Sequence, residues 1–493
     1  MKSALVAFSI VALVFSPAYA DDFRVFTSAQ GVAIKAKLVG IANGQVTIVR
    51  EDGRQFTLPV TALSAADQDF LKTAPAPTAA RPSSAAGLKP APSPNDKVSA
   101  EDVNAVVGQA LFGEMSLWDM PAGDVAAKLA LPPESKTKNQ SSFRSYPKED
   151  FKMFGARPYS VALYAEKDKV TSLSLVFANK GDLFGAAGSG QLHFDKDTPP
   201  EDAAKITKQA MDIDLKAITS TLSAKLGEPK KERFGEGKVG RMNMQRWDWR
   251  GHAVLLAEAE GEYVGVQIVT TAFADEGGKV ARMSDAIVRD QALANLQKRE
   301  NGDVVIGDIP MVDQGPKGYC VPATAERAMR YLGVSADMYI LANAGESGYG
   351  GGTSVEMLLM GVGRHIRAKG RSFDSWDGPM KMKDLTKILD KGVPVIWALF
   401  STDEFNNTAN ARTAKRKTTT DWAAWKTQVT AESQASVLPK DKETGHVVLI
   451  IGYNKETNEI AFSDSWGERF IERWITIPEA EQVSQGRFYV IGF

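Results

Sequence analysis

Cys320 is the only cysteine of the 493-residue chain, and its neighbours suit a reactive thiol. A loop with two glycines and a proline precedes it, and an apolar-periodic run over residues 325–332 follows and ends at Gly333. This pattern predicts a helix whose first turn holds Cys320 and Pro322. The positive end of a helix dipole favours the thiolate, which is the nucleophilic form of cysteine. Cys320 is therefore a candidate nucleophile; the alternatives are a small buried hydrophobic residue and an intermolecular cross-link.

A catalytic thiolate needs a base, because a free thiol with a pKa near 8.5 is only a few per cent ionised at neutral pH. His446 stands at the head of a strongly apolar run, residues 445–453, which predicts a strand. Asp464 follows eighteen residues later, after a turn at 454–458 and a second apolar run. The predicted hairpin returns Asp464 to His446, where a carboxylate would fix the imidazole tautomer and stabilise its charged form.

The order of these residues resembles the papain superfamily of cysteine peptidases. Gln314 lies six residues before Cys320, and Asp464 opens an Asp-Ser-Trp-Gly turn. Papain-like peptidases have a glutamine at that distance, then a histidine on a long strand, then Asn or Asp in a Ser-Trp-Gly turn. The chain is most similar to the bacteriocin-processing-peptidase-like branch, in which the third member is Asp. The resemblance covers about residues 303–493.

The resemblance implies thiol-dependent hydrolysis of peptide bonds, with no metal and no cofactor. Cys320 would attack the acyl carbon, His446 would take and return the proton, and Asp464 would orient His446. Gln314 would donate its side-chain amide to the oxyanion, alongside the backbone N–H of Cys320. Losing one such donor typically costs about 2.7–4 kcal/mol of transition-state stabilisation. Trp466 would shield the His446–Asp464 pair from water, although a plain core tryptophan fits the sequence as well.

Two further segments are candidates for contact with a substrate. Gly351 and Gly352 resemble the Gly-Gly segment that pairs with the substrate backbone in this superfamily, and a structural glycine turn is the alternative. A polar, Lys/Thr-rich insertion spans residues 402–444, just before His446. It is interpreted either as a lid over the cleft or as an inert helical decoration.

Two other functions stay open on the sequence alone. Transglutaminase-like acyltransferases use the same Cys, His, Asp order, and a catalytically inactive binding protein could keep the papain fold. The spacing of Gln314 and the Ser-Trp-Gly turn favour the peptidase over the acyltransferase. Retention of Gln, Cys, His and Asp together favours an enzyme over a binding protein.

Length and composition predict several folded units around this site. The chain is too long for one ordinary domain, and 43% hydrophobic residues suffice for several cores. The net charge of -1, with no dominant basic stretch, argues against binding to nucleic acid. We therefore expect a multidomain α+β protein with a small N-terminal β-barrel, a central α+β domain and a C-terminal papain-like α+β domain at residues 300–493.

The first twenty residues predict a cleavable signal peptide. Lys2 gives a positive start, residues 4–15 form a short apolar run, and Ala18-Tyr19-Ala20 is a small-residue cleavage site. An uncleaved anchor is the alternative. No later stretch reaches about 18 uninterrupted apolar residues, so no membrane span is expected after cleavage. The sequence thus predicts a secreted or periplasmic protein, in which an unpaired cysteine is exposed to oxidation.

Residues 21–74 alternate in the manner of short strands, at 32–38, 45–49 and 55–59, and end in a short helix capped by Ser64. This pattern predicts a small barrel. It resembles the Src-homology-3-like module named after a yeast endocytic adaptor, which implies a peptide or cell-wall ligand; a spacer without a ligand is the alternative. The matching residues are Phe26-Thr27-Ser28, Gly31, Ala36, Asp52-Gly53, Leu63-Ser64 and Asp67-Gln68.

Residues 75–100 are rich in Pro, Ala and Ser, which predicts an extended linker. Residues 101–290 are predicted to form an α+β domain in which we find no catalytic constellation. Its predicted elements are a helix at 200–226 and strands at 160–164, 172–178, 246–249, 253–257 and 263–269. Recognition of a substrate and inhibition as a pro-region are both open roles for this domain.

Overall fold

The computed structural model describes residues 23–29, 31–42, 44–50, 55–73, 93–185, 198–259 and 261–493. The chain forms two compact units, Met1–Ala86 and Gly87–Phe493. The predicted signal peptide and residues 75–92 of the predicted linker lie outside the described residues. The domain boundaries proposed from the sequence stay predictions.

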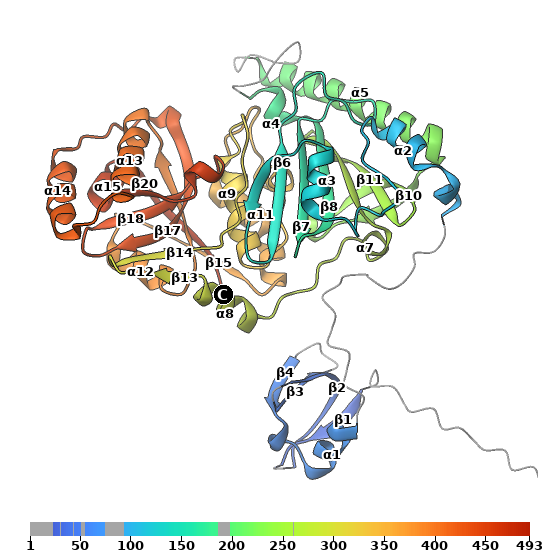
Figure 1. Ribbon diagram of the computed structural model, residues 1–493, viewed down its shortest axis with the longest axis horizontal. Coiled ribbons are helices and arrows are strands. Elements are labelled where there is room, and N and C mark those ends of the chain that lie inside the picture. Colours follow the sequence, from blue (N-terminus) through green and yellow to red (C-terminus); the bar gives the residue numbers. More distant parts are fainter. Residues whose placement is uncertain are drawn as a thin grey trace, which may run out of the picture. The chain divides into compact units, whose positions relative to one another are not determined.

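The N-terminal unit contains a four-stranded antiparallel sheet in chain order (Figure 1). Its strands are β1 (Arg24–Thr27), β2 (Ala33–Ala42), β3 (Gln45–Arg50) and β4 (Gln55–Pro59), and a 3-10 turn (Val60–Ala62) and α1 (Ala65–Thr73) follow. The three predicted strands and the closing helix are confirmed. In the part of this unit that the structure describes, β1 and β4 do not pair, so no closed barrel is found. The Src-homology-3-like resemblance stays a prediction, and its Asp52-Gly53 lies outside the described residues.

Asp67 explains one of the matched positions of this unit in structural terms. Its buried carboxylate accepts hydrogen bonds from the Arg24 guanidinium (2.7 Å), the backbone N–H of Thr27 (2.7 Å) and the Ser64 hydroxyl (2.9 Å). The side chain therefore links α1 to β1, and this structural role accounts for Asp67 without a ligand.

The central segment of the second unit is built on an eight-stranded antiparallel sheet in the order β5-β6-β7-β8-β12-β11-β10-β9 (Figure 1). All predicted strands of this segment are confirmed. The strands are β5 (Pro133–Lys136), β6 (Gln140–Ser145), β7 (Ser160–Glu166), β8 (Lys169–Asn179), β9 (Lys230–Phe234), β10 (Met242–Trp249), β11 (His252–Ala259) and β12 (Tyr263–Thr270).

The long helix α5 (Pro200–Leu226) packs on this sheet, with Met211, Ile218 and Leu222 buried. It ends at Gly227, whose φ of 72° lies in the left-handed region that glycine adopts without strain. The predicted helix is confirmed at both ends. The remaining helices of this segment are a 3-10 turn (Pro94–Lys97), α2 (Ala100–Val107), α3 (Ala122–Lys128), α4 (Lys180–Leu183), α6 (Gly237–Gly240), α7 (Thr271–Asp275) and α8 (Asp285–Ala294).

The C-terminal segment has a second sheet, in the order β13-β14-β17-β16-β20-β15, with β18 on β17 and β19 on β18. The strands are β13 (Leu296–Lys298), β14 (Asp303–Ile306), β15 (Ser372–Asp377), β16 (Val395–Phe400), β17 (Gly445–Asn454), β18 (Glu459–Ser463), β19 (Arg473–Thr476) and β20 (Ser484–Gly492). The helices are α9 (Cys320–Tyr331), α10 (Met338–Ala344), α11 (Val355–Ala368), α12 (Met382–Leu389), α13 (Asp403–Arg416), α14 (Trp422–Ala435) and α15 (Ile477–Val483), with 3-10 turns at Lys442–Thr444 and Glu468–Phe470. Helices α9 and α11 lie between the two sheets (Figure 1).

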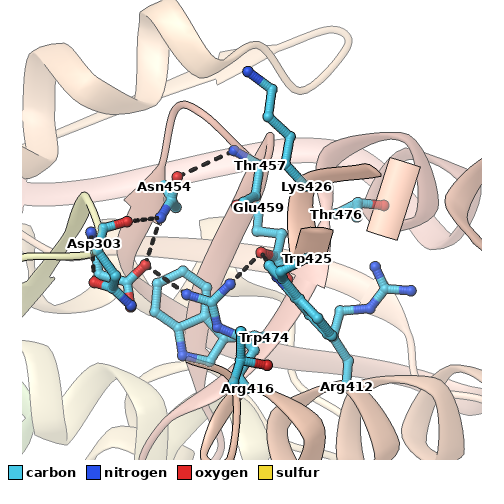
Figure 2. Close-up of polar contacts among 12 residues, drawn as sticks. Asp303, Arg412, Arg416, Trp425, Lys426, Asn454, Thr457, Glu459, Trp474 and Thr476 are labelled. Atoms are coloured by element: carbon cyan, nitrogen blue, oxygen red, sulfur yellow. Dashed lines mark hydrogen bonds and ion pairs between the residues drawn. The ribbon is translucent and has the colours of Figure 1, made fainter. Parts of the chain in front are cut away.

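The insertion at residues 402–444 forms α13 and α14, which are fixed to the β18–β19 hairpin by buried charges (Figure 2). The Arg416 guanidinium contacts the carboxylates of Asp303 and Glu459 and lies 3.8 Å from the ring centroid of Trp474. The indole N–H of Trp425 donates to Glu459 at 3.1 Å. Both insertion helices are thus anchored on the hairpin that leads to Asp464.

Arg416→Met is expected to lower the free energy of unfolding by about 3–5 kcal/mol, because it leaves two buried carboxylates without their guanidinium partner. Urea unfolding of the full chain measures the change. Lys426→Met on α14 is the matched control, since its pair with Glu456 is exposed and contributes within about 1 kcal/mol. Equal losses from both variants would contradict the buried anchor.

Candidate active site

Cys320 is the first residue of α9, as predicted; it is a free cysteine, and the residue as a whole is half-buried. The helix is held against the C-terminal sheet by its apolar face, where Val321, Ala325 and Ala328 are buried and α9 contacts β17. The thiol therefore sits at the positive end of a helix dipole.

His446 and Asp464 are brought together by the predicted hairpin. His446 is the second residue of β17, and Asp464 directly follows β18. The two strands pair antiparallel, with Leu449 opposite Ser463, so the chain returns beside His446. The imidazole Nε2 lies 2.8 Å from Asp464 Oδ1, and both side chains are buried.

His446 also interacts with the Cys320 thiol, and Nδ1 is the nitrogen left for it because Asp464 occupies Nε2. Burial alone would lower the pKa of His446, but the hydrogen bonds to Asp464 and Cys320 outweigh it and raise the pKa to about 9. Burial raises the pKa of the Cys320 thiol, yet the hydrogen bond and charge of His446 bring it below its usual value. The two groups can therefore form a thiolate–imidazolium pair near neutral pH.

Arg473 holds the second oxygen of Asp464, and nothing in the sequence motifs pointed to it. Its guanidinium donates to Asp464 Oδ2 at 2.7 Å, and only 1% of the arginine surface is exposed. Burial raises the pKa of Asp464, but His446 and Arg473 together bring it below its ordinary value. Asn406 and Asn410 of α13 accept further hydrogen bonds from Arg473 at 3.0–3.1 Å. The insertion thus supports the carboxylate from the side away from His446.

Trp466 covers one face of the His446 imidazole. The two ring centroids are 4.6 Å apart with the planes 25° from parallel, and Phe470 packs edge-on against the tryptophan. The electron-rich face of an indole favours a positively charged partner. The arrangement fits the shielding that the sequence predicts for Trp466.

Gln314 is buried in the loop before Cys320 and is tied to the turn that carries Asp464. Its backbone N–H donates to the Ser465 carbonyl at 2.9 Å, and its side-chain Nε2 donates to the Lys317 carbonyl at 3.1 Å. That second bond uses one hydrogen of the amide and fixes its plane, so the other N–H remains for a ligand.

Gly351 and Gly352 lie against the same loop. The Gly318 N–H donates to the Gly350 carbonyl at 2.9 Å, and the Gly352 N–H donates to the Gly318 carbonyl at 3.1 Å. A Cβ atom on Gly351 would lie 2.3 Å from the Gly318 Cα, and φ is 124°, so only glycine fits there. The glycines hold the loop before Cys320; their contact with a substrate stays a prediction.

Residues 306–492 match the Peptidase_C39 like family. This match supports a papain-like cysteine peptidase domain in the C-terminal part of the chain. No curated protein matches the chain. Across the described residues, no helix combines the length and the apolar character that a membrane crossing requires.

Proposed function

We propose that residues 300–493 form an exported cysteine peptidase that hydrolyses peptide bonds with Cys320 as nucleophile. The observation that carries the proposal is the position of His446, which interacts with the Cys320 thiol and is hydrogen-bonded to Asp464 at 2.8 Å. The helix start at Cys320, the lowered pKa of its thiol and the family match over residues 306–492 support the same reading.

In the proposed reaction, the Cys320 thiolate forms a bond to the carbonyl carbon of the peptide, and the carbonyl oxygen becomes an oxyanion. The free N–H of Gln314 and the backbone N–H of Cys320 would stabilise that charge. The His446 imidazolium gives its proton to the leaving amine, and the C–N bond breaks. Water then attacks the thioester carbonyl while His446 takes its proton, the C–S bond breaks, and the carboxylic acid leaves with the thiolate–imidazolium pair restored.

Three supporting groups keep His446 in the protonation states that these reaction steps require. Asp464 fixes the proton on Nε2 of the neutral ring and stabilises the imidazolium. Arg473 favours the ionised form of Asp464, and Trp466 covers the ring. These roles are part of the proposal.

The site of action is proposed to be outside the cytoplasm, on the pattern of residues 1–20. The substrate class is protein or peptide. The N-terminal unit is proposed to bind a peptide or a cell-wall component.

Stoichiometric labelling by an epoxysuccinyl thiol inhibitor at pH 7 tests the nucleophile. The full chain is expected to take up one equivalent at Cys320, and His446→Ala is expected to take up almost none, because the thiol then returns to its un-ionised form. Intact-mass measurement detects the adduct. Absence of labelling in the wild-type chain would favour the inactive binding protein.

The reaction type is tested with a labelled peptide library and an amine donor in the same vessel. Shorter peptides are expected by mass spectrometry, with the Cys320-labelled chain as the control. Products joined to the amine in place of cleaved products would assign the site to acyl transfer instead.

A further inference from the structure

The central segment makes several polar contacts with the C-terminal segment at the loop just before Cys320. The Asp313 N–H donates to the Glu134 carboxylate of β5 at 2.9 Å, and the Tyr146 hydroxyl donates to the Asp313 carbonyl at 2.5 Å. The Met311 N–H donates to the Ser135 hydroxyl at 2.9 Å. The edge strand β5, together with Tyr146 directly after β6, therefore binds the start of this loop.

Lys317 extends from the same loop into the central segment and is only 2% exposed. Its ammonium lies 3.2 Å from Asp182 of α4 and faces the rings of three tyrosines at 4.4–5.5 Å, which are Tyr146, Tyr319 and Tyr339. The Tyr339 hydroxyl donates to the other oxygen of Asp182 at 3.1 Å. A buried ammonium needs such a carboxylate, so Asp182 fixes where Lys317 can lie.

The backbone of Lys317 in turn fixes Gln314. Its carbonyl accepts the hydrogen bond from Gln314 Nε2, which sets the orientation of the amide proposed to face the oxyanion. On the other side of the loop, the Gly350 N–H donates to the Lys180 carbonyl of α4 at 3.1 Å. A Cβ on Gly181 would lie 2.5 Å from the Tyr319 ring, so α4 packs directly on the residue before Cys320.

We propose that the central segment is a permanent part of the catalytic site, in which Asp182 acts through Lys317 to hold Gln314 in position for the oxyanion. Asp182 and Lys317 are positioning residues, and the inference rests on the proposed function. An inhibitory pro-region has to leave without damage to the enzyme. Removal of this segment would instead strip a buried ammonium of its carboxylate and the loop of its hydrogen-bond partners.

Two small thiol reagents separate positioning of the oxyanion donor from the reactivity of the thiolate. p-Nitrophenyl acetate acylates a thiolate: a sulfur–carbonyl bond forms through an oxyanion, and p-nitrophenolate leaves. Iodoacetamide alkylates a thiolate by displacement of iodide from a saturated carbon, with no oxyanion. Neither reagent depends on the peptide specificity of the site.

Asp182→Asn in the full chain keeps the shape of the side chain and its hydrogen bond with Tyr339 but removes the charge. It is expected to slow acylation of Cys320 at least about tenfold, as Gln314→Ala does, and to leave alkylation within about twofold of wild type. The double variant Asp182→Asn/Gln314→Ala is expected to lose no more acylation rate than Gln314→Ala alone, since both changes disable the same hydrogen-bond donor. Asp212→Ala, on the exposed face of α5, is the matched control and should change neither rate.

Three results would each overturn the inference. The first is a loss of acylation rate in the double variant equal to the product of the two single losses. The others are an unchanged acylation rate in Asp182→Asn and a fall of its acylation and alkylation rates together. A wild-type chain whose Cys320 reacts with neither reagent would instead overturn the proposed function. The two failures are therefore distinguishable.

Discussion

Cys320→Ser is expected to lower the rate of peptide hydrolysis by about 10⁴-fold or more while leaving the fold unchanged. Serine has the same number of heavy atoms and places a smaller oxygen where the sulfur lies, and the residue is half-buried, so the fold is expected to persist. A serine hydroxyl starts from a far higher pKa than a thiol, and the influences that lower the pKa of Cys320 cannot bring it near neutrality. His446 would also be left without its anionic partner.

The measurement is kcat/KM on a peptide that the library experiment identifies, with the thermal unfolding midpoint as the check on folding. The wild-type chain alkylated by iodoacetamide serves as the control, because it lacks the thiolate but keeps every residue. Hydrolysis by Cys320→Ser within about tenfold of wild type would mean that a different group attacks the substrate.

The sequence was sufficient to predict those parts of the site that depend on neighbouring residues in the chain. The loop and apolar run around Cys320 were enough to predict the start of α9, which is confirmed. Two apolar runs separated by a turn were enough to predict the β17–β18 hairpin, and hence the approach of Asp464 to His446. Each depends on periodicity or turn chemistry within about twenty residues.

The supporting charges could not be predicted because their partners lie far away in the sequence. Lys317 meets Asp182 and Arg473 meets Asn406 only after the sheets and helices have packed. In sequence, each is one more charged residue in a polar stretch, which normally indicates a solvated surface. The anchoring of α13 could not be predicted for the same reason, since Arg412 and Arg416 on its buried face have partners far away in the sequence.

Three strands of the central sheet were also missed, β5, β6 and β9. They contain few β-branched or aromatic residues and many charged or small polar ones, as in the Lys230–Phe234 strand. β5 and β9 lie at the two edges of the sheet, where polar side chains guard against unwanted pairing. The edge strands of this sheet are thus hard to predict from the sequence. One of them, β5, nevertheless makes the contact with the loop before Cys320.

Asp464→Asn is expected to lower kcat by about 10⁴-fold, because Arg473 would orient the new amide with its NH₂ toward His446. Asparagine occupies this position in many papain-like peptidases, so a simple reading predicts a mild effect. In this chain, however, Arg473 donates to Asp464 Oδ2 and would claim the amide oxygen of an asparagine. The amide NH₂ would then face His446 Nε2, which must become an acceptor, and the ring proton would move to Nδ1. A neutral imidazole protonated on Nδ1 cannot take the proton from Cys320.

The alkaline limb of the pH–rate profile is expected to move in the same variant. His446 must be protonated to supply the leaving amine, so activity falls as the pH rises through its pKa of about 9. Burial lowers the pKa of His446, and the hydrogen bond and charge of Asp464 oppose that effect, so their loss lowers this pKa. The limb should therefore shift toward lower pH.

The double variant Asp464→Asn/Arg473→Met separates this account from a simple loss of charge. Without the guanidinium, the asparagine amide is free to turn its oxygen toward His446 Nε2, and activity is expected to recover at least about tenfold over Asp464→Asn alone. Arg473→Met by itself keeps the correct tautomer and should lose only roughly 10–100-fold, as with other residues that orient a functional side chain. If the negative charge of Asp464 were all that mattered, the double variant would instead be no better than Asp464→Asn, and Arg473 would have no part in setting the tautomer of His446.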